Sequence, residues 1–413
     1  MSLEILKNKY YFLIIVISIV WVSFFYYILQ FNKQNFIFPD SENYKESASY
    51  LYHNLKPHYF RPLVMAIITG FPYLFKCSDA QIYAFSFYLN LLCWIGTSLL
   101  LFNLLKEFVS LKKSFFYTCI YISLVGSTII NFHLLTESIF NFMIMLAYFF
   151  IFKYYKTSKF YFLSISLSLF IITILIKPGI QFLAVLLLIF YLTTLLKNIF
   201  KISILFVLFS ISIFVFQLVE MKEEYGNYTV SYIDGFTYYN YLGSRATAIK
   251  NKATNLDYDI DRANNFNKKK YGDQRKLVFE DLKSQLHNNS KNLVKAYAYN
   301  LLENTKTHSA SISKCYNFEN KRTFIVAKNI LIIISKWQNR IFTFLGVVLA
   351  FFFLYKSEKK NPFYALFSIY ILFIFFTSGI SFGEGDRFHI VFFPAVILLL
   401  AKFISNEKKI ISI

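Results

Sequence analysis

The sequence predicts an all-α membrane protein, a helical bundle of about ten spans with a mixed region outside the bilayer. Hydrophobic residues make up 56% of the 413 residues. They gather in blocks long enough to cross a bilayer, for which about 20 residues suffice. Lysine is concentrated in every second loop between the blocks, as is typical of cytoplasmic loops. The net charge of +20 favours contact with anionic lipid, and we expect no nucleic acid partner.

Ten apolar blocks are expected to span the membrane. The first follows Lys7 and Lys9, is longer than a signal-peptide core and has no small-residue cleavage site after it. It should therefore remain as an anchor, with its N-terminus in the cytoplasm. The expected spans are 10–29, 81–105, 115–135, 138–152, 160–176, 179–196, 202–219, 338–355, 362–380 and 388–403.

The charge of the loops agrees with this count. With ten spans, the cytoplasmic segments carry sixteen lysines and four acidic residues, whereas the short outer segments carry seven basic and seven acidic residues. Cytoplasmic loops hold the excess of basic residues. We therefore expect a multi-pass protein of the cytoplasmic (inner) membrane with both termini inside.

Two apolar stretches are too short to be counted as spans. Pro62–Phe75 has fourteen residues and is broken by Gly70 and Pro72, so we expect a re-entrant or interfacial helix in the first outer loop. Phe324–Ser335 is also short, and Lys328 interrupts it. If either stretch crossed the membrane alone, the charge comparison would invert for every later loop.

The polar region from about 221 to 323 separates two membrane modules. It has no block of span length, but Phe, Tyr, Leu and Val recur in it, so we expect a folded outer cap rather than a disordered tether. The predicted domains are an N-terminal transmembrane module with juxtamembrane helices in its first loop (1–220), an extracytoplasmic domain (221–336) and C-terminal transmembrane helices (337–413).

Polar residues gather in the loops that this topology places on the outer face. A charged group at the hydrocarbon boundary is costly unless it is paired or functional, and we interpret Asp40, Glu137 and Arg387 together as functional. Others are interpreted as solvated loop charges, namely Glu42, Lys56, Lys76 and Asp386. The remaining outer candidates are Tyr44, His53, His58, Arg61, His133, Thr136, Lys177, Glu384 and His389.

A metal site is one alternative for part of this set. His133 and Glu137 are four residues apart and could share a helix face as metal ligands. Two ligands do not make a site, and a helix-end hydrogen bond is the other interpretation. A metal requirement is left open. The sequence contains no Gly-rich phosphate loop, so a cytoplasmic nucleotide-driven enzyme is not indicated.

Five short motifs follow one another on the outer side: Phe38-Pro39-Asp40-Ser41-Glu42-Asn43-Tyr44, Phe60-Arg61-Pro62-Leu63, His133-Leu134-Leu135-Thr136-Glu137-Ser138, Leu175-Ile176-Lys177-Pro178 and Gly385-Asp386-Arg387-Phe388. In order and sidedness they resemble the class C glycosyltransferases, most of all the branch with the aminoarabinose transferases and protein O-mannosyltransferases. The resemblance covers about 1–200 and 337–403. Lys177 stands where the family often has Arg, which loses bidentate phosphate binding, and one Pro follows Arg61 where two are common.

The resemblance implies transfer of a sugar from a polyprenyl-phosphate donor to a lipid, glycan or protein acceptor at the outer face of the membrane. Asp40 would be the general base, and residues 1–220 the catalytic module. Glu137 would position the acceptor, tune Asp40 or hold a metal. No cofactor is certain, and a divalent cation is left open.

The remaining candidates follow from the same chemistry. The leaving group is a lipid phosphate, so nearby bases should stabilise its charge. The expected phosphate-binding residues are Lys177, Arg387 and Arg61. The expected substrate-binding residues are Tyr44, His133 and Glu384.

Two other functions compete with this one. A polysaccharide polymerase or ligase also acts on lipid-linked glycans, but the first-loop motif with Asp40 argues against it. A lipid-linked oligosaccharide transporter should bury ionisable residues near mid-bilayer and show paired repeats. The predicted spans are almost free of charge, and we find no repeat.

Overall fold

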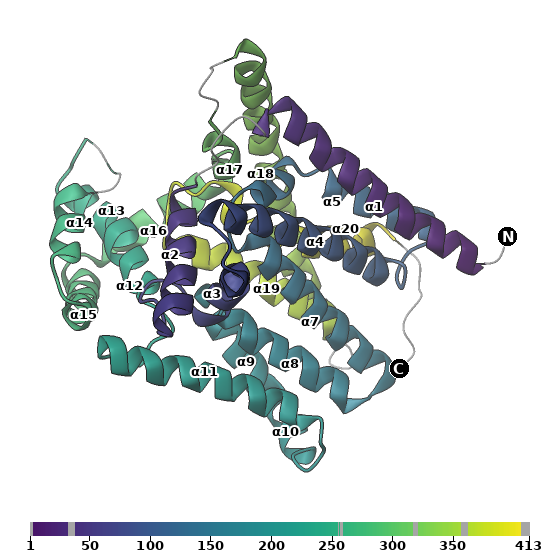
Figure 1. Ribbon diagram of the computed structural model, residues 1–413, viewed down its shortest axis with the longest axis horizontal. Coiled ribbons are helices and arrows are strands. Elements are labelled where there is room, and N and C mark those ends of the chain that lie inside the picture. Colours follow the sequence, from purple (N-terminus) through teal and green to yellow (C-terminus); the bar gives the residue numbers. More distant parts are fainter. Residues whose placement is uncertain are drawn as a thin grey trace.

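The computed structural model describes residues 3–31, 38–254, 256, 259–316, 321–356 and 362–405, in which helices are joined by turns and loops (Figure 1). These ranges contain no strand, and a single isolated bridge joins Ser309 to Gly385. The all-α class is therefore confirmed. Residues 221–323, which we call the outer region after the side of the membrane that the sequence predicts for them, were expected to be mixed but are also helical where described.

The chain before the outer region runs through α1 (Leu3–Ile28), α2 (Pro39–Asn54), α3 (Leu63–Gly70), η2 (Phe71–Phe75), α4 (Asp79–Leu105), α5 (Leu111–Ile122), α6 (Val125–Ile129), η3 (Ile130–Phe132), α7 (Glu137–Thr157), α8 (Phe160–Ile174), η4 (Pro178–Ile180), α9 (Gln181–Phe190), α10 (Leu192–Lys197) and α11 (Ile204–Tyr225). The outer region holds α12 (Ile233–Thr237), the π-helix η5 (Tyr238–Gly243), α13 (Ser244–Lys250), α14 (Ile260–Asn267), α15 (Tyr271–Asn288), α16 (Ser290–Lys306) and α17 (Ala310–Ser313). The last part holds α18 (Arg322–Tyr355), α19 (Phe363–Ser378), η6 (Asp386–Phe388) and α20 (Phe393–Ile404).

Within the described ranges, five helices are long and apolar enough to cross a membrane, and a sixth span is formed if one bent pair is counted as a unit. The five are Asn8–Ile28, α4, α7, α11 and α18. The bent pair joins α5 to α6 and η3 at an angle of 69°, so the expected span 115–135 is broken near its middle. The other four expected spans correspond to shorter apolar helices, which are α8, η4 with α9, α19 and α20.

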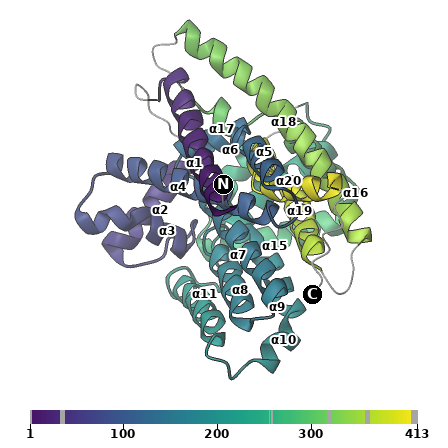
Figure 2. The same cartoon turned by 90° about the vertical axis from the view of Figure 1, so that its right-hand side faces the viewer.

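The short helices nevertheless pack with the long ones. Figure 2 shows α8, α9 and α11 grouped beside α7, while α19 and α20 accompany α18. In Figure 1 the outer helices α12 to α16 gather at the left, and α1 begins at the right edge. Helices α2 and α3 lie between these two ends and contact each other. Where α2 and α3 meet, a Cβ on Gly70 would come within 2.5 Å of the Tyr52 ring.

The longest helix differs from its prediction. The apolar stretch 324–335 and the expected span 338–355 form one helix of 34 residues, α18. Lys328 does not interrupt it, because the ammonium group reaches off the helix to the carbonyl oxygens of Ser313 and Cys315, at 2.9 and 2.6 Å. The domain boundary expected between residues 336 and 337 therefore falls inside α18.

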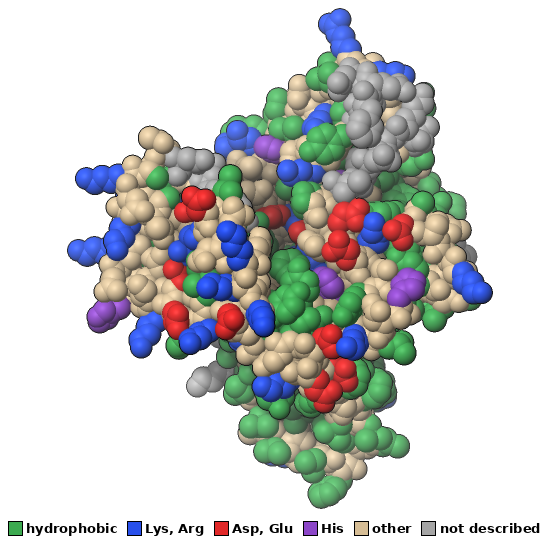
Figure 3. Space-filling model, turned by 60° about the vertical axis from the view of Figure 1, so that its left-hand side comes forward, with side chains coloured by type: hydrophobic (Ala, Val, Ile, Leu, Met, Phe, Trp, Pro, Cys, Tyr) green, Lys and Arg blue, Asp and Glu red, His purple; other side chains and the backbone are tan. Residues whose placement is uncertain are grey.

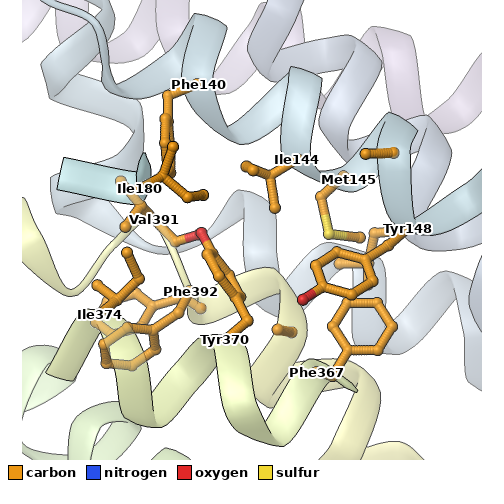
Figure 4. Close-up of a cluster of buried hydrophobic side chains, with 14 of the residues drawn as sticks. Phe140, Ile144, Met145, Tyr148, Ile180, Phe367, Tyr370, Ile374, Val391 and Phe392 are labelled. Atoms are coloured by element: carbon orange, nitrogen blue, oxygen red, sulfur yellow. The ribbon is translucent and has the colours of Figure 1, made fainter. Parts of the chain in front are cut away.

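A buried aromatic core holds α7 against the last part of the chain (Figure 4). The rings of Tyr148 and Phe367 stack with centroids 4.1 Å apart. The Tyr148 hydroxyl donates to the carbonyl of Leu366 at 3.0 Å, and Tyr370 donates to Val391 at 2.8 Å. Because buried hydroxyls need partners, these bonds fix α7 relative to α19 and to the segment after η6. That arrangement brings the start of α7 to the loop before η6.

Candidate functional site

One guanidinium group, that of Arg387, joins three carboxylates from three parts of the chain. Its Nη1 lies 2.5 Å from Asp40 Oδ2 and 3.1 Å from Glu384 Oε2, and its Nε lies 2.7 Å from Glu137 Oε1. The side chain of Glu137 is 1% exposed, whereas that of Asp40 is 29% exposed. The site is therefore closed on the Glu137 side and reachable at Asp40.

Two further bases complete the arrangement. Nη2 of Arg61 lies 3.0 Å from Asp40 Oδ1, and Nζ of Lys177 lies 2.9 Å from Glu137 Oε1. Asp40 thus lies between two guanidinium groups, and Glu137 between a guanidinium and an ammonium group. We call Asp40, Arg61, Glu137, Lys177, Glu384 and Arg387 the charged cluster. Its three acids and three bases balance, as buried charges must if their desolvation is to be offset.

Aromatic rings hold the two arginines in place. The Arg61 guanidinium lies 4.1 Å from the centre of the Tyr44 ring and 4.9 Å from that of Phe60, and Nη1 donates to the Tyr44 hydroxyl at 3.1 Å. The Arg387 guanidinium lies 4.8 Å from the centre of the Phe38 ring. Cations are attracted to ring faces, so these rings orient the bases that face Asp40.

The start of α2 fixes Asp40. Phe38 is extended, as a residue before proline should be, and Pro39 begins the helix with a φ angle suited to that position. Asp40 then lies in the first helical turn, where the partial positive charge of the helix end favours a carboxylate. Glu137 occupies the corresponding place as the first residue of α7.

The turn that carries Glu384 and Arg387 depends on glycine. Gly383 and Gly385 have φ angles of +78° and +56°, a region that L-residues with side chains rarely adopt. A Cβ on Gly385 would also lie 2.0 Å from the carbonyl oxygen of His308. The close approach of this turn to the outer region therefore needs glycine at position 385.

Asparagines of the outer region and α18 hold the ends of this turn. Asn304 donates to the carbonyls of Ser378 and Ser381, each at 2.9 Å. At the other end, the side-chain oxygen of Asn339 lies 3.0 Å from Nδ1 of His389, which is fully buried. The loop is thus tied to helices on both sides before any substrate is present.

Asp386 differs from its prediction. The sequence suggested a solvated charge, but this residue is 3% exposed, and its Oδ2 would lie 2.0 Å from a Cβ on Gly126. The residue is packed against α6, where a glycine leaves room for its carboxylate. Burial raises the pKa of Asp386 to about 7, even though a hydrogen bond with Ser309 acts in the opposite direction.

The carboxylates of the cluster differ in their acidity. Burial alone would raise the pKa of Asp40, but the charges of Arg387 and Arg61 outweigh it and hold the pKa well below its usual range. The pKa of Glu384 is raised, mainly by burial, although Arg387 acts against it. In this arrangement Asp40 is ionised and has a low affinity for protons.

His133 lies beside the charged cluster and packs against residues that support it. Its Nε2 donates to the carbonyl oxygen of Ser311 on α17 at 2.9 Å, and its ring packs edge-on against Phe38 with centroids 5.5 Å apart. The Phe38 ring also contacts the Arg387 guanidinium. His133 therefore helps to hold in place the ring on which Arg387 packs. Among the described residues, no group of three or more His, Cys, Asp and Glu side chains is placed to hold a metal ion.

The structure therefore brings together Asp40, Arg61, Glu137, Lys177, Glu384 and Arg387, with Tyr44 in contact through Arg61. Glu42 pairs with Lys45 at 2.7 Å and lies outside the cluster. Sequence reasoning missed the supporting role of Phe38 and the need for Gly126 and Gly385. The Gly-x-Gly spacing around Glu384 was the available signal for a tight turn.

The cluster can attract an anion through its bases and hold a hydroxyl through its carboxylates. Comparison with known proteins adds no further evidence for either use: no protein-family model, no curated protein and no solved structure matches this chain.

Proposed function

We propose that this protein is a membrane glycosyltransferase that moves a sugar from a polyprenyl-phosphate donor to an acceptor hydroxyl. The observation that carries the proposal is the charged cluster itself. It joins Asp40, Glu137 and Arg387, which are far apart in the sequence, and leaves Asp40 as the most exposed of the three. Of the six charges, those of Arg61, Glu137 and Arg387 are buried, and burying charges at the end of a helical bundle is costly for a purely structural protein.

The proposed reaction is a single displacement. The acceptor oxygen forms a bond to the anomeric carbon as the bond from that carbon to the donor phosphate oxygen breaks. The hydroxyl proton passes to Asp40, and the bonding electron pair leaves with the phosphate. Attack from the side opposite to the leaving group inverts the configuration of the anomeric carbon.

The bases of the cluster would stabilise the leaving phosphate. Arg387 can present two donors to one phosphate, which Lys177 cannot. Both side chains bond to the same carboxylate oxygen of Glu137. A phosphate bound beside Glu137 would therefore meet both charges at once, which is the electrostatic stabilisation that a developing anion needs.

Donor binding would also prepare Asp40 for its role as a base. Without substrate, Arg387 and Arg61 hold the pKa of Asp40 low, and a carboxylate with such a low pKa accepts protons poorly. A phosphate that draws Arg387 toward itself removes part of that positive field. The proton affinity of Asp40 then rises at the moment when the acceptor hydroxyl must be deprotonated.

The proposal includes the ten-span topology, with both termini in the cytoplasm and the cluster on the outer face of the inner membrane. The short helices α8, α9, α19 and α20 would then complete their crossings with adjoining turns and loops. This placement puts the bases at the level of lipid headgroups. Nucleotide sugars are not normally available on that side, so a lipid-linked donor is proposed.

The test supplies purified protein in nanodiscs with radiolabelled sugars linked either to polyprenyl phosphate or to a nucleotide, and with envelope extract of the source cells as acceptor. We expect label to reach the acceptor from a lipid-linked donor only, and Asp40→Asn provides the background. Transfer from a nucleotide sugar without any lipid carrier would reject the mechanism. So would transfer that is equal in the Asp40→Asn protein.

A further inference from the structure

A second feature of the outer face is a cavity of about 860 Å³ next to the charged cluster. This volume lies within the range of small-molecule sites, about 300–1,000 Å³. Its walls come from α2, from the segment before α3, from the end of α11 and from the outer region. The lining residues are Asn43, Tyr59, Phe60, Glu224, Tyr225, Tyr232, Phe236, Phe266, Asn267, Lys269, Lys270, Tyr271, Gly272, Asp273 and Gln274.

The composition of this lining is unusual for so apolar a protein. Seven of its residues are Tyr or Phe, and none is Leu, Ile, Val or Met. In Figure 3, hydrophobic side chains lie between two charged lobes on the face that carries the outer region. The apolar helices of this protein expose Leu, Ile and Val beside Phe and Tyr, and a cavity for a lipid chain would be expected to contain such aliphatic side chains too. A lining with aromatic rings but no Leu, Ile, Val or Met indicates a different ligand.

The rings form a prearranged group around Tyr271. Its ring centroid lies 4.6 Å from that of Tyr59, 5.0 Å from that of Tyr225 and 5.7 Å from that of Tyr232. Backbone and hydroxyl hydrogen bonds fix these walls: the Tyr232 N–H donates to the Tyr59 carbonyl at 3.0 Å, and the Tyr225 hydroxyl donates to the Pro57 carbonyl at 2.8 Å. The cavity is therefore held open by bonds between separate parts of the chain.

Hydrogen-bonding groups stand beside the rings. Asn43 and Asn267 carry amides, Asp273 a carboxylate, and Lys269 and Lys270 are exposed ammonium groups. The turn with the two lysines is itself fixed, because the amide of Gln274 donates to the carbonyls of Phe266 and Lys269, at 3.4 and 3.2 Å. Ring faces next to amides and charges match a ligand with apolar faces and polar edges.

The cavity also adjoins the charged cluster. Asn43 follows Asp40 by three residues on α2, which places the two side chains on neighbouring positions of one helix face. Phe60, another wall residue, lies under the guanidinium of Arg61, which in turn bonds Asp40. A ligand that fills the cavity would therefore end one helical turn from the proposed base.

We infer that this cavity binds a glycan, as the acceptor of the proposed transfer. A sugar ring has C–H faces that pack on aromatic rings and hydroxyl edges that bond to amides, carboxylates and ammonium groups, and the lining offers each of these. The inference rests on the proposed function, since the end of the glycan must present a hydroxyl to Asp40. It selects a glycan from the three acceptor classes, lipid, glycan and protein.

The test measures binding apart from transfer. The probe is the pool of short oligosaccharides released from the envelope of the source cells, added to the full-length protein in nanodiscs. Saturation-transfer NMR with irradiation of aromatic protons of the protein detects the sugar C–H groups that contact aromatic rings. The method also detects oligosaccharides that bind weakly. We expect such signals with the unaltered protein and with Asp40→Asn, because that substitution leaves the cavity intact.

Two aromatic residues of α15 form the matched pair of variants. Tyr271 is in the cavity, whereas Phe279 is 68% exposed and is not among its lining residues. Tyr271→Ala should weaken binding roughly two- to tenfold, the loss of one ring contact. Tyr271→Phe should keep most of the oligosaccharide binding, and Phe279→Ala should leave the binding unchanged. Circular dichroism and thermal midpoints check that each variant is folded.

The outcomes separate the two proposals. Sugar signals that are absent, or that survive unchanged in a folded Tyr271→Ala protein, would overturn the glycan cavity. If envelope extract replaces the oligosaccharide pool, signals from lipid or peptide that depend on Tyr271 would also overturn it, in favour of another acceptor class. Tyr271-dependent sugar binding without transfer from any lipid-linked donor would instead reject the glycosyltransferase and leave the binding site standing.

Discussion

At the residue scale, the site depends on one arginine that satisfies three carboxylates. Charge and sidedness in the sequence identified Asp40, Glu137 and Arg387 as a set, because charged groups at the bilayer boundary are rare. The pairing itself could not be predicted, since it depends on how α7 and the turn before η6 meet in the fold. Phe38 belongs to the motif that carries Asp40, but the contact of its ring with Arg387 depends on the same meeting of elements and could not be predicted.

Asp40→Asn should abolish sugar transfer while the protein remains folded. The amide is nearly isosteric but cannot take the acceptor proton, and loss of a general base commonly costs about 10²–10⁴ in rate. Initial rates in nanodiscs measure the effect. Glu42→Gln is the matched control, because Glu42 lies two residues away and pairs with Lys45 outside the charged cluster. Near-normal turnover by Asp40→Asn, or an equal loss in Glu42→Gln, would contradict the role.

The buried carboxyl group of Asp386 should make the free energy of unfolding depend on pH. Its pKa is raised to about 7 by burial, so between about pH 4 and pH 7 the folded protein binds a proton that the unfolded chain has already released. Stability then falls as pH rises through this window. A pKa moved from about 4 to about 7 corresponds to roughly 4 kcal/mol of lost stability at pH 8.

Asp386→Asn removes this titration, because an amide does not ionise. The difference in thermal midpoint, variant minus unaltered protein, should therefore be larger at pH 8 than at pH 5. Glu46→Gln, at an exposed position of α2, is the control, and its difference should be the same at both pH values. Midpoints measured at one heating rate give the comparison. Parallel curves for Asp386→Asn and the unaltered protein would show that this carboxyl does not titrate near neutrality.

At the element scale, the position of the apolar segments could be predicted from the sequence. The points where helices end or bend were harder to predict. Gly70 and Pro72 correctly indicated a short helical segment within 62–75, and it forms α3 and η2. Lys328 suggested a break that does not exist, because hydropathy does not reveal that an ammonium group can reach carbonyls of another segment. The 69° bend between α5 and α6 was likewise hidden within a continuous apolar run.

The turn before η6 should be the element least tolerant of added bulk. Gly385→Ala would place a methyl group 2.0 Å from the His308 carbonyl oxygen at a φ of +56°. Strained backbone and overpacking each cost on the order of 1–3 kcal/mol. We expect a lower thermal midpoint and lost transfer, since Glu384 and Arg387 flank this residue.

Gly179→Ala is the control for that substitution. Gly179 follows Lys177 and Pro178 near the charged cluster, but a Cβ there would meet nothing within 4 Å. Its stability should change by less than about 0.5 kcal/mol. If both alanine variants unfold at the same temperature and transfer sugar equally well, the close approach of the turn to His308 is not needed for the site.

At the scale of the whole molecule, the orientation in the membrane decides whether the charged cluster meets lipid-linked sugars. The outer region packs against both membrane modules, through α16 with α18 and α19 and through the cavity wall with α2. Its contacts are long-range, so neither propensity nor hydropathy could place it. The loop charges nevertheless predict its side of the membrane.

The orientation predicts which positions an impermeant thiol reagent can reach in spheroplasts. Glu46→Cys on α2 and Asn264→Cys on α14 are exposed and should react from outside, whereas Lys112→Cys on α5, exposed as well, should react only after permeabilisation. The background lacks Cys77, Cys93, Cys119 and Cys315, which are free thiols in the structure. Lys112→Cys labelled in sealed spheroplasts would place the start of α5 outside. Glu46→Cys and Asn264→Cys protected together would place the charged cluster in the cytoplasm, where nucleotide sugars are available and a lipid-linked donor would no longer be required.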